Sequence, residues 1–120
     1  MGKVLIVDDA SLVRSVASKA AREAGHVVVT AEDGQKGLDA IRAERFDIIF
    51  SDVNMPIMGG LEMVENIRKE PSYKFTPIVM LTTESNVDLK NQGKALGVKA
   101  WLLKPFNKEK FLIACEKLLG

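Results

Sequence analysis

The sequence contains only one cysteine, Cys115. A single thiol cannot close a disulfide within the chain, and it cannot supply a cluster of thiolates for a metal ion. The start of the chain also lacks the basic and apolar leader of a secreted protein. These absences predict a protein of the reduced, cytoplasmic compartment.

The chain also lacks an excess of charge and any long apolar stretch. It has 17 Lys and Arg against 16 Asp and Glu, a net charge of +1. This is not the basic surplus of a protein that binds a phosphate backbone, so no nucleic acid partner is expected. No apolar stretch approaches the ~20 residues of a spanning helix, so no membrane insertion is expected. The 120 residues suffice for one domain with a sizeable core.

Five short apolar runs alternate with amphipathic segments along the chain. The runs are predicted to be strands at 3–8, 27–31, 47–51, 77–82 and 100–103. The segments after them are predicted to be helices at about 11–24, 35–43, 61–69, 86–96 and 108–119. Regular alternation of this kind predicts an α/β domain whose strands form a parallel sheet.

The first and fourth predicted helices differ in the strength of their apolar pattern. The first is expected to expose Arg14, Lys19, Arg22 and Glu23 and to bury the face formed by Leu12, Val13, Val16, Ala17, Ala20 and Ala24. The fourth has few apolar residues and an interior glycine, Gly93, which costs roughly 1 kcal/mol relative to alanine. We expect this weak helix to shift most readily.

Four of the predicted strands end in residues that can do chemistry. Asp8 and Asp9 follow the first strand, Asp52 follows the third, Thr82 closes the fourth and Lys104 follows the fifth. Because ligands bind outside the carboxyl ends of the strands in open α/β sheets, these side chains are expected at one functional edge. Taken alone, each of these residues could also have a purely structural role. An aspartate, for example, often caps a helix or starts a turn.

Three carboxylates that meet at one edge cannot all stay ionised unless a positive charge lies among them. Mg²⁺ suits all-oxygen ligands, and it typically takes one or two carboxylates together with phosphate oxygens. The predicted site therefore combines carboxylates for a metal, a carboxylate nucleophile, and a hydroxyl and an ammonium that would contact phosphoryl oxygens.

A family resemblance rests on motifs spread along the chain. They are Asp8-Asp9, Asp52 followed by Met55-Pro56 and Gly60, Thr82, and Lys104-Pro105-Phe106. With these motifs in order, the chain resembles the receiver domains of two-component response regulators over essentially its whole length. Asn54, Glu84 and the end of the chain at Gly120 make it most similar to stand-alone chemotaxis regulators. The resemblance implies a doubly wound (βα)5 flavodoxin-like fold, with a five-stranded parallel sheet in the order 2-1-3-4-5.

The resemblance also implies a role for each residue of the predicted site. Asp52 would accept a phosphoryl group from a histidine kinase, and Thr82 and Lys104 would contact the phosphoryl oxygens. In the free protein Lys104 would pair with Asp52. Mg²⁺ would be held by Asp8, Asp9, Asp52 and the backbone carbonyl of Asn54. The Lys104-Pro105 bond is a candidate cis peptide, as in the family.

Further positions match the family only in part. Trp101 stands where the family has a switch aromatic, commonly Tyr or Phe, and is expected to be half exposed beside the fourth helix. Asn54, Thr83 and Glu84 stand where family members tune self-hydrolysis of the phosphate. Thr83 is larger than the Ala, Gly or Ser usual there, which would narrow access to the site. Gly59 replaces a polar helix cap.

Residues 1–120 are expected to form one monomeric receiver domain without an output domain. It would be a phosphorylation-activated switch, not an enzyme, with self-catalysed phosphorylation and dephosphorylation. It would signal by binding a protein such as the flagellar motor switch through its fourth helix, fifth strand and fifth helix. One alternative is a phosphorelay intermediate or a receiver cut from a longer regulator. Another is an aspartyl-phosphate hydrolase of similar fold, although these need a second acid where this chain has Asn54.

Overall fold

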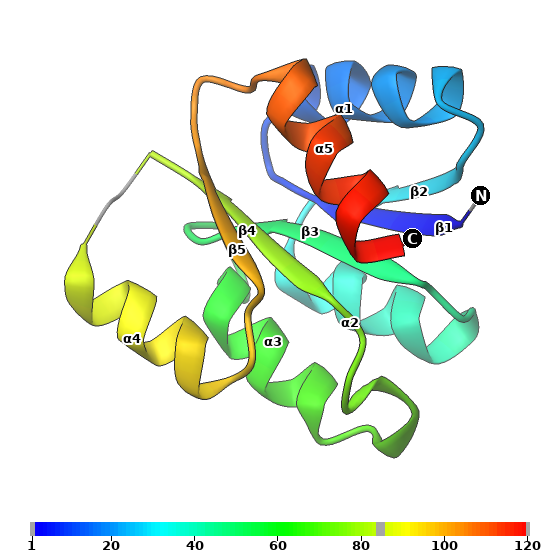
Figure 1. Cartoon of the computed structure of the whole chain (residues 1–120). Helices are drawn as coiled ribbons and strands as arrows, with labels where there is room; N and C mark the ends of the chain where they lie inside the picture. The colour runs from blue at the N-terminus through cyan, green and yellow to red at the C-terminus, as the bar shows by residue number, and fades with distance from the viewer. Residues whose placement is uncertain (1, 84–85, 120) are drawn as a thin grey trace.

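Five parallel strands form a sheet in the order β2-β1-β3-β4-β5 in the computed structural model, which describes residues 2–83 and 86–119 (Figure 1). The strands are β1 (Lys3–Val7), β2 (Val27–Ala31), β3 (Ile48–Asp52), β4 (Ile78–Thr82) and β5 (Ala100–Leu103). The helices are α1 (Ser11–Glu23), α2 (Gly34–Ala43), α3 (Gly60–Arg68), α4 (Val87–Ala95) and α5 (Lys108–Leu119), with a short 3-10 helix, η1 (Pro71–Tyr73). The predicted fold class and strand order are confirmed.

The predicted elements agree with the observed ones to within about one residue at each end. The sequence does not predict η1, because Pro71 was expected only to end the preceding helix and not to begin a new one. Among the described residues, none of the helices combines the length and the apolar character that crossing a bilayer requires.

The strands β1 and β3 are neighbours in the sheet although β2 lies between them in the chain. The chain goes from β1 to the edge strand β2 and then returns to pair β3 with the other side of β1. Val7 pairs in register with Ser51, so the next residues, Asp8 and Asp52, stand side by side. This reversal is the topological switch point at which open α/β sheets bind ligands.

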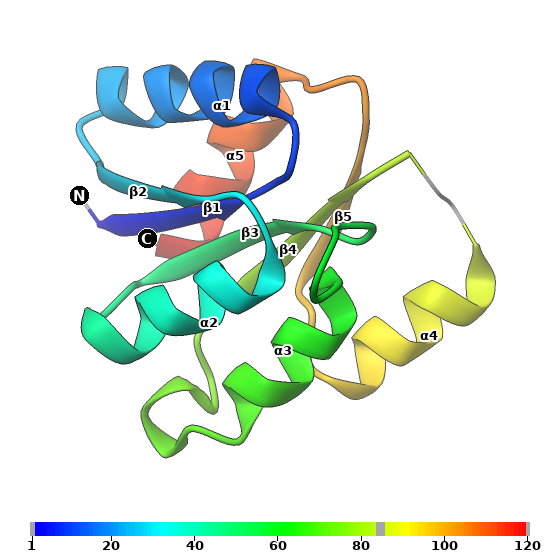
Figure 2. The ribbon, with the colours of Figure 1, turned by 180° about the vertical axis from the view of Figure 1, so that it is seen from behind.

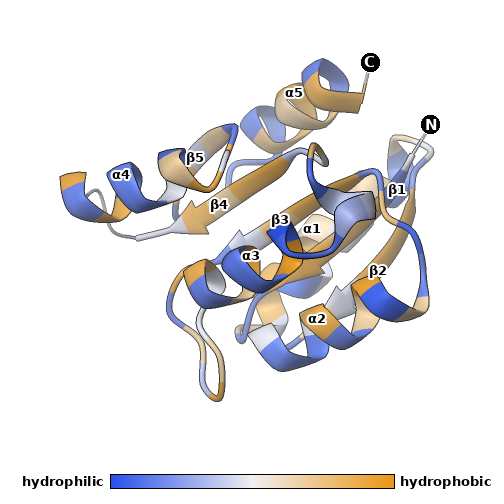
Figure 3. Cartoon of the chain, turned by 90° about the horizontal axis from the view of Figure 1, so that it is seen from below, coloured by the Kyte–Doolittle hydropathy of each residue, from blue (hydrophilic) through white to orange (hydrophobic). Residues whose placement is uncertain are grey.

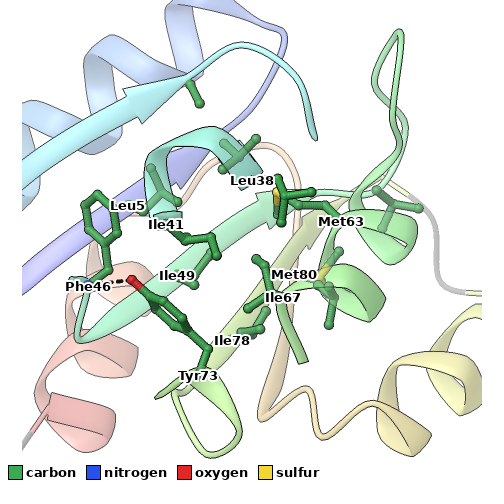
Figure 4. Close-up of a cluster of buried hydrophobic side chains, with 14 residues drawn as sticks. Leu5, Leu38, Ile41, Phe46, Ile49, Met63, Ile67, Tyr73, Ile78 and Met80 are labelled. Carbon is green, nitrogen blue, oxygen red and sulfur yellow. Dashed lines mark hydrogen bonds between the residues drawn. The ribbon is translucent and has the colours of Figure 1, made fainter. Parts of the chain in front are cut away.

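Helices cover both faces of the sheet. The helices α1 and α5 lie on one face, and α2, α3 and α4 lie on the other (Figures 1 and 2). On the first face Phe50 packs against Phe111, with ring centroids 4.5 Å apart. On the second face the Tyr73 hydroxyl accepts a hydrogen bond of 3.1 Å from the Phe46 backbone N–H (Figure 4). Burial on both faces explains the continuous apolar runs of the strands, which the colour of β4 shows (Figure 3).

The prediction for the buried face of α1 is wrong in part. Leu12 is 73% exposed and Val16 is 41% exposed, and Ala24 is also exposed. The buried residues of the helix are instead Ala17, Ser18, Ala20 and Ala21. Because α5 covers part of the same face of the sheet, α1 turns its small residues inward, where they permit a close approach to the strands. Leu12 and Val16 are left toward solvent, whereas Val13 is half buried against the core, as predicted.

The interior glycine of α4 accommodates the tryptophan of β5. A Cβ atom at position 93 would lie 2.6 Å from Cζ2 of Trp101, which is closer than carbon atoms approach. Trp101 is half buried and packs against the core cluster on this face, as Leu89 of α4 does. Gly93, which on sequence alone only weakens the helix, therefore makes room for the indole ring.

Replacing Gly93 with alanine tests this packing. In an exposed helix the change would stabilise the protein by roughly 1 kcal/mol. Here we expect a loss of about 1–3 kcal/mol in the free energy of unfolding, the usual cost of overpacking, together with a shifted Trp101 emission. Denaturant unfolding gives the first quantity. In a Trp101→Leu background the penalty should disappear because the ring is gone; an equal loss in both backgrounds would contradict this account.

Candidate functional site

Three aspartates gather at the carboxyl ends of β1 and β3. Asp8, Asp9 and Asp52 each place a carboxylate oxygen within 4.8 Å of the others. Asp8 is fully buried and Asp52 is 8% exposed, whereas Asp9 is exposed. The structure therefore brings together the three carboxylates that the strand ends predict, and it leaves one of them open to solvent.

The ammonium of Lys104 lies among these carboxylates. Its Nζ atom is 2.8 Å from Oδ2 of Asp8 and 3.2 Å from Oδ2 of Asp52. Burial opposes the charged form of Lys104, but the hydrogen bond to Asp8 and the charges of Asp52 and Asp8 outweigh it and raise the pKa of the ammonium. The peptide bond between Lys104 and Pro105 is cis. Lys104 thus pairs with Asp52, as expected, but its shorter contact is with Asp8.

The carboxylate of Asp52 is held at both oxygens. Oδ1 accepts a hydrogen bond of 2.8 Å from the Val53 backbone N–H, and Oδ2 faces Lys104. Burial raises the pKa of Asp52, and the charge of Asp8 raises it further, although Lys104 and the Val53 N–H offset part of this effect. Burial and the charge of Asp8 together outweigh the stabilisation that the Lys104 ammonium gives to the ionised carboxylate.

The carboxylate of Asp8 has an oxygen that suits a cation. Oδ1 accepts a hydrogen bond of 2.9 Å from the Ala10 backbone N–H. The buried Oδ2 faces the Lys104 ammonium at 2.8 Å, and the described residues donate no further hydrogen bond to it. A buried carboxylate oxygen with open lone pairs, next to two further carboxylates, fits the oxygen-only ligand set that Mg²⁺ prefers.

The structure also describes four of the remaining predicted residues. Thr82 ends β4 and is 1% exposed, and its carbonyl accepts a hydrogen bond of 2.8 Å from the Lys104 backbone N–H. The next residue, Thr83, is exposed, as is Asn54 two positions after Asp52. Trp101 pairs in register with Met80, two residues before Thr82. Glu84 lies outside the described residues.

The turn between β3 and α3 is shaped by close backbone contacts. Gly60 N donates a hydrogen bond of 2.8 Å to the Val53 carbonyl, and a Cβ at position 60 would lie 2.0 Å from the Asp52 carbonyl oxygen. Ile57 has a φ of 69° and is 82% exposed. Left-handed backbone is rare for a β-branched residue, so nothing in the sequence pattern indicates this conformation. The turn fixes the backbone directly after Asp52.

The sequence and the fold of the chain are similar to those of known response regulator receiver proteins. Residues 4–116 match the sequence model of the response regulator receiver domain. The chain is 34% identical to protein PilG of Pseudomonas aeruginosa over 95% of this chain and 84% of that protein. It is 34% identical to a chemotaxis protein CheY homolog of Campylobacter jejuni over 98% of this chain and 92% of that protein. The solved structure of chemotaxis protein CheY4 of Vibrio cholerae superposes with a TM-score of 0.94 at 48% identity, covering 99% of both chains.

The charge imbalance predicts a pH-dependent gain of stability in Asp52→Asn. A carboxyl whose pKa is raised by folding binds its proton more tightly in the native state, so its contribution to stability falls as pH rises through its titration. Without Mg²⁺ at pH 7, we expect Asp52→Asn to be more stable than the parent by roughly 1 kcal/mol. The difference should shrink as the pH falls toward the ordinary pKa of an aspartate.

Denaturant midpoints at a series of pH values, with a chelator present, measure this difference. Glu65→Gln, which removes an exposed carboxylate of α3, is the matched control and should show little change at any pH. A destabilised Asp52→Asn protein at pH 7 would show that pairing with Lys104 outweighs the repulsion.

Proposed function

The chain belongs to the response regulator receiver domain family, and on that premise we propose that it is a signalling switch in which Asp52 accepts a phosphoryl group from a histidine kinase. Receiver domains are signalling domains, and the family implies a kinase partner and a downstream target. The observation that carries the proposal is the position of Asp52, which contacts Lys104 and lies within 4.8 Å of two further carboxylates at the switch point of the sheet.

The transfer asks this chain mainly for alignment and for compensation of charge. A carboxylate oxygen of Asp52 attacks phosphorus, the bond from phosphorus to the imidazole nitrogen of the donor breaks, and an acyl phosphate forms. The released imidazole takes a proton from solvent. The Val53 N–H, 2.8 Å from Oδ1, orients the carboxylate. The buried residues around Asp52 limit the access of water to the acyl phosphate.

Lys104 and Thr82 would contact the transferred group. Lys104 would exchange its contact with Asp52 for the phosphoryl oxygens while keeping Asp8, and the Thr82 hydroxyl would donate to another oxygen. Asp8, Asp9, Asp52 and the backbone carbonyl of Asn54 would hold Mg²⁺, which supplies charge stabilisation to the phosphoryl oxygens. Asn54, Thr83 and Glu84 would set the rate of hydrolysis through the access of water.

We assign the output to the surface of α4, β5 and α5. When Thr82 turns toward phosphate, Trp101 would move inward and change this surface, to which a downstream protein binds. The Campylobacter jejuni relative and the Vibrio cholerae structure are named as chemotaxis proteins, which supports a chemotaxis pathway and a target such as the flagellar motor switch. We also propose that residues 1–120 act as one monomeric receiver in the cytoplasm.

The acceptor role is tested by incubation with acetyl phosphate and Mg²⁺, read by intact mass and by Trp101 fluorescence. The parent should gain one phosphoryl group and change its emission, whereas Asp52→Asn should gain none, because an amide is a far weaker nucleophile than a carboxylate. Asp39→Asn, a change at an exposed residue of α2, should react like the parent. Undiminished uptake by Asp52→Asn would place the acceptor elsewhere.

Thr83 gives a second prediction. If its side chain crowds the approach to phosphorus, Thr83→Ala should speed both phosphorylation by acetyl phosphate and loss of the phosphoryl group by about two- to tenfold, since both need an in-line approach. Thr83→Val is the matched control, because valine keeps the bulk and removes the hydroxyl. It should react at the parental rate. Slower phosphorylation in both variants would instead assign the hydroxyl a direct contact with the phosphoryl group.

A further inference from the structure

A polar groove runs between α1 and the edge strand β2, on the side of the protein away from α4. It is an open groove of about 350 Å³, which gives room for a small anion. Every residue that lines it is polar or charged. Those that matter for its chemistry are Arg14, Ser15, Ser18, Lys19 and Arg22 of α1 and Thr30 of β2.

The α1 residues of this groove follow the helical repeat. They are three and four positions apart, so they form one strip along the helix. Arg14 and Arg22 are eight positions apart, which places their backbones about 12 Å from each other along the axis. Their long side chains can therefore close on a ligand of several atoms from its two ends.

The cations of the strip are not neutralised by acids. None of Arg14, Lys19 and Arg22 forms an ion pair with a carboxylate of the described residues. Glu32 is close enough to Arg14 for the arginine to contribute to its lowered pKa, but the main causes are its hydrogen bond and charge interaction with Lys36. The groove therefore keeps a surplus of positive charge.

One of the arginines is already held in place. Arg14 Nη1 donates a hydrogen bond of 2.7 Å to the Asp8 carbonyl, and Arg14 is half buried. Arg22 Nη2 is 3.5 Å from the Val28 carbonyl, a weak contact that leaves its donors free to turn to a ligand. A guanidinium that is ordered before binding loses less conformational entropy when it binds an anion.

Ser18 provides an independent sign of a missing partner. It is 4% exposed, and its buried Oγ atom has no hydrogen-bond partner among the described residues. Buried hydroxyls in native proteins are almost always satisfied. Ser18 borders the groove, but its Oγ is turned away from solvent. A ligand oxygen between Arg14 and Arg22 would become its partner once the side chain rotates toward the groove.

We propose that the α1–β2 groove binds a small anion that carries two or more phosphoryl groups. Guanidinium groups match phosphate oxygens in geometry, and serine and threonine hydroxyls complete the donor set. The lining offers no aromatic or apolar side chain on which a nucleobase would stack, so recognition is of the phosphates alone. The groove adjoins the acidic cluster through the hydrogen bond from Arg14 to the Asp8 carbonyl. It uses none of the carboxylates of that cluster, so the proposal does not rest on the function proposed for Asp52.

The test is a titration of the full chain with inorganic pyrophosphate in the presence of a metal chelator, followed by amide NMR and calorimetry. Amide shifts should concentrate at residues 14–22 and 30. Arg22→Gln should weaken binding about tenfold through the loss of a charge-assisted contact, and Lys94→Gln, a charge removed from the exposed surface of α4, should leave it unchanged.

Ser18→Ala separates binding from folding. Removing an unsatisfied buried hydroxyl should leave stability equal or raised, while pyrophosphate affinity falls by about threefold, for the loss of one hydrogen bond. Absence of binding at millimolar pyrophosphate would overturn the proposal. So would shifts confined to residues 8, 9 and 52, an equal response to sodium chloride at matched ionic strength, or unchanged affinity in Arg22→Gln.

Discussion

Three carboxylates lie together around the Lys104 ammonium among the described residues, and the geometry of the site depends on this excess of negative charge. Asp8 is fully buried, so its charge cannot be relieved by water, and it needs a partner held at a fixed position. Lys104 supplies that partner at 2.8 Å while also reaching Asp52 at 3.2 Å. The arrangement exists only because β1 and β3 are neighbours, which the reversal of strand order at β1 produces. In the proposed function this cluster would take a cation first, and the cation would then offset the charge of the incoming phosphoryl group.

Much of the pocket could be predicted because its residues end strands. Burial on both faces makes each strand an apolar run, and the residue that ends the run is visible in the sequence, as Asp52 and Thr82 show. Parallel strands present these ends at one edge, so their proximity follows without any knowledge of contacts. The second contact of Lys104, to Asp8, could not be predicted in the same way. It depends on the path of the chain after β5, and strand periodicity carries no information on that path.

The predictions failed where distant packing overrides local pattern. Hydropathy ranks Leu12 and Val16 above Ala17 and Ala21, yet α1 buries the alanines because the available surface favours close approach over bulk. From the sequence alone, Gly93 is expected only to destabilise α4. The structure shows that the glycine is needed because the Trp101 ring lies beside it. The left-handed backbone of Ile57 has no local cause, since isoleucine disfavours it. The turn around it, tied through the Gly60 N–H to the Val53 carbonyl, imposes it instead.

The proposed switch can be weighed in free energy. Moving a two-state equilibrium from 1:99 to 99:1 requires about 5.5 kcal/mol of differential binding. New hydrogen bonds from Lys104 and Thr82 to a phosphoryl dianion, at about 1.5–3 kcal/mol each for charged partners, together approach this amount. The same two residues are joined through the Lys104 N–H and the Thr82 carbonyl, so the ends of β4 and β5 would respond together.

Trp101 stands three residues before Lys104 and packs against Gly93 of α4. A side chain at position 93 would displace the indole ring of Trp101. The unphosphorylated protein would then lose the contact between Trp101 and α4 that, in the proposed switch, distinguishes it from the phosphorylated protein. Trp101 and Gly93 therefore pack as a pair: the large ring requires the glycine, and in the proposed switch this contact would couple β5 to α4.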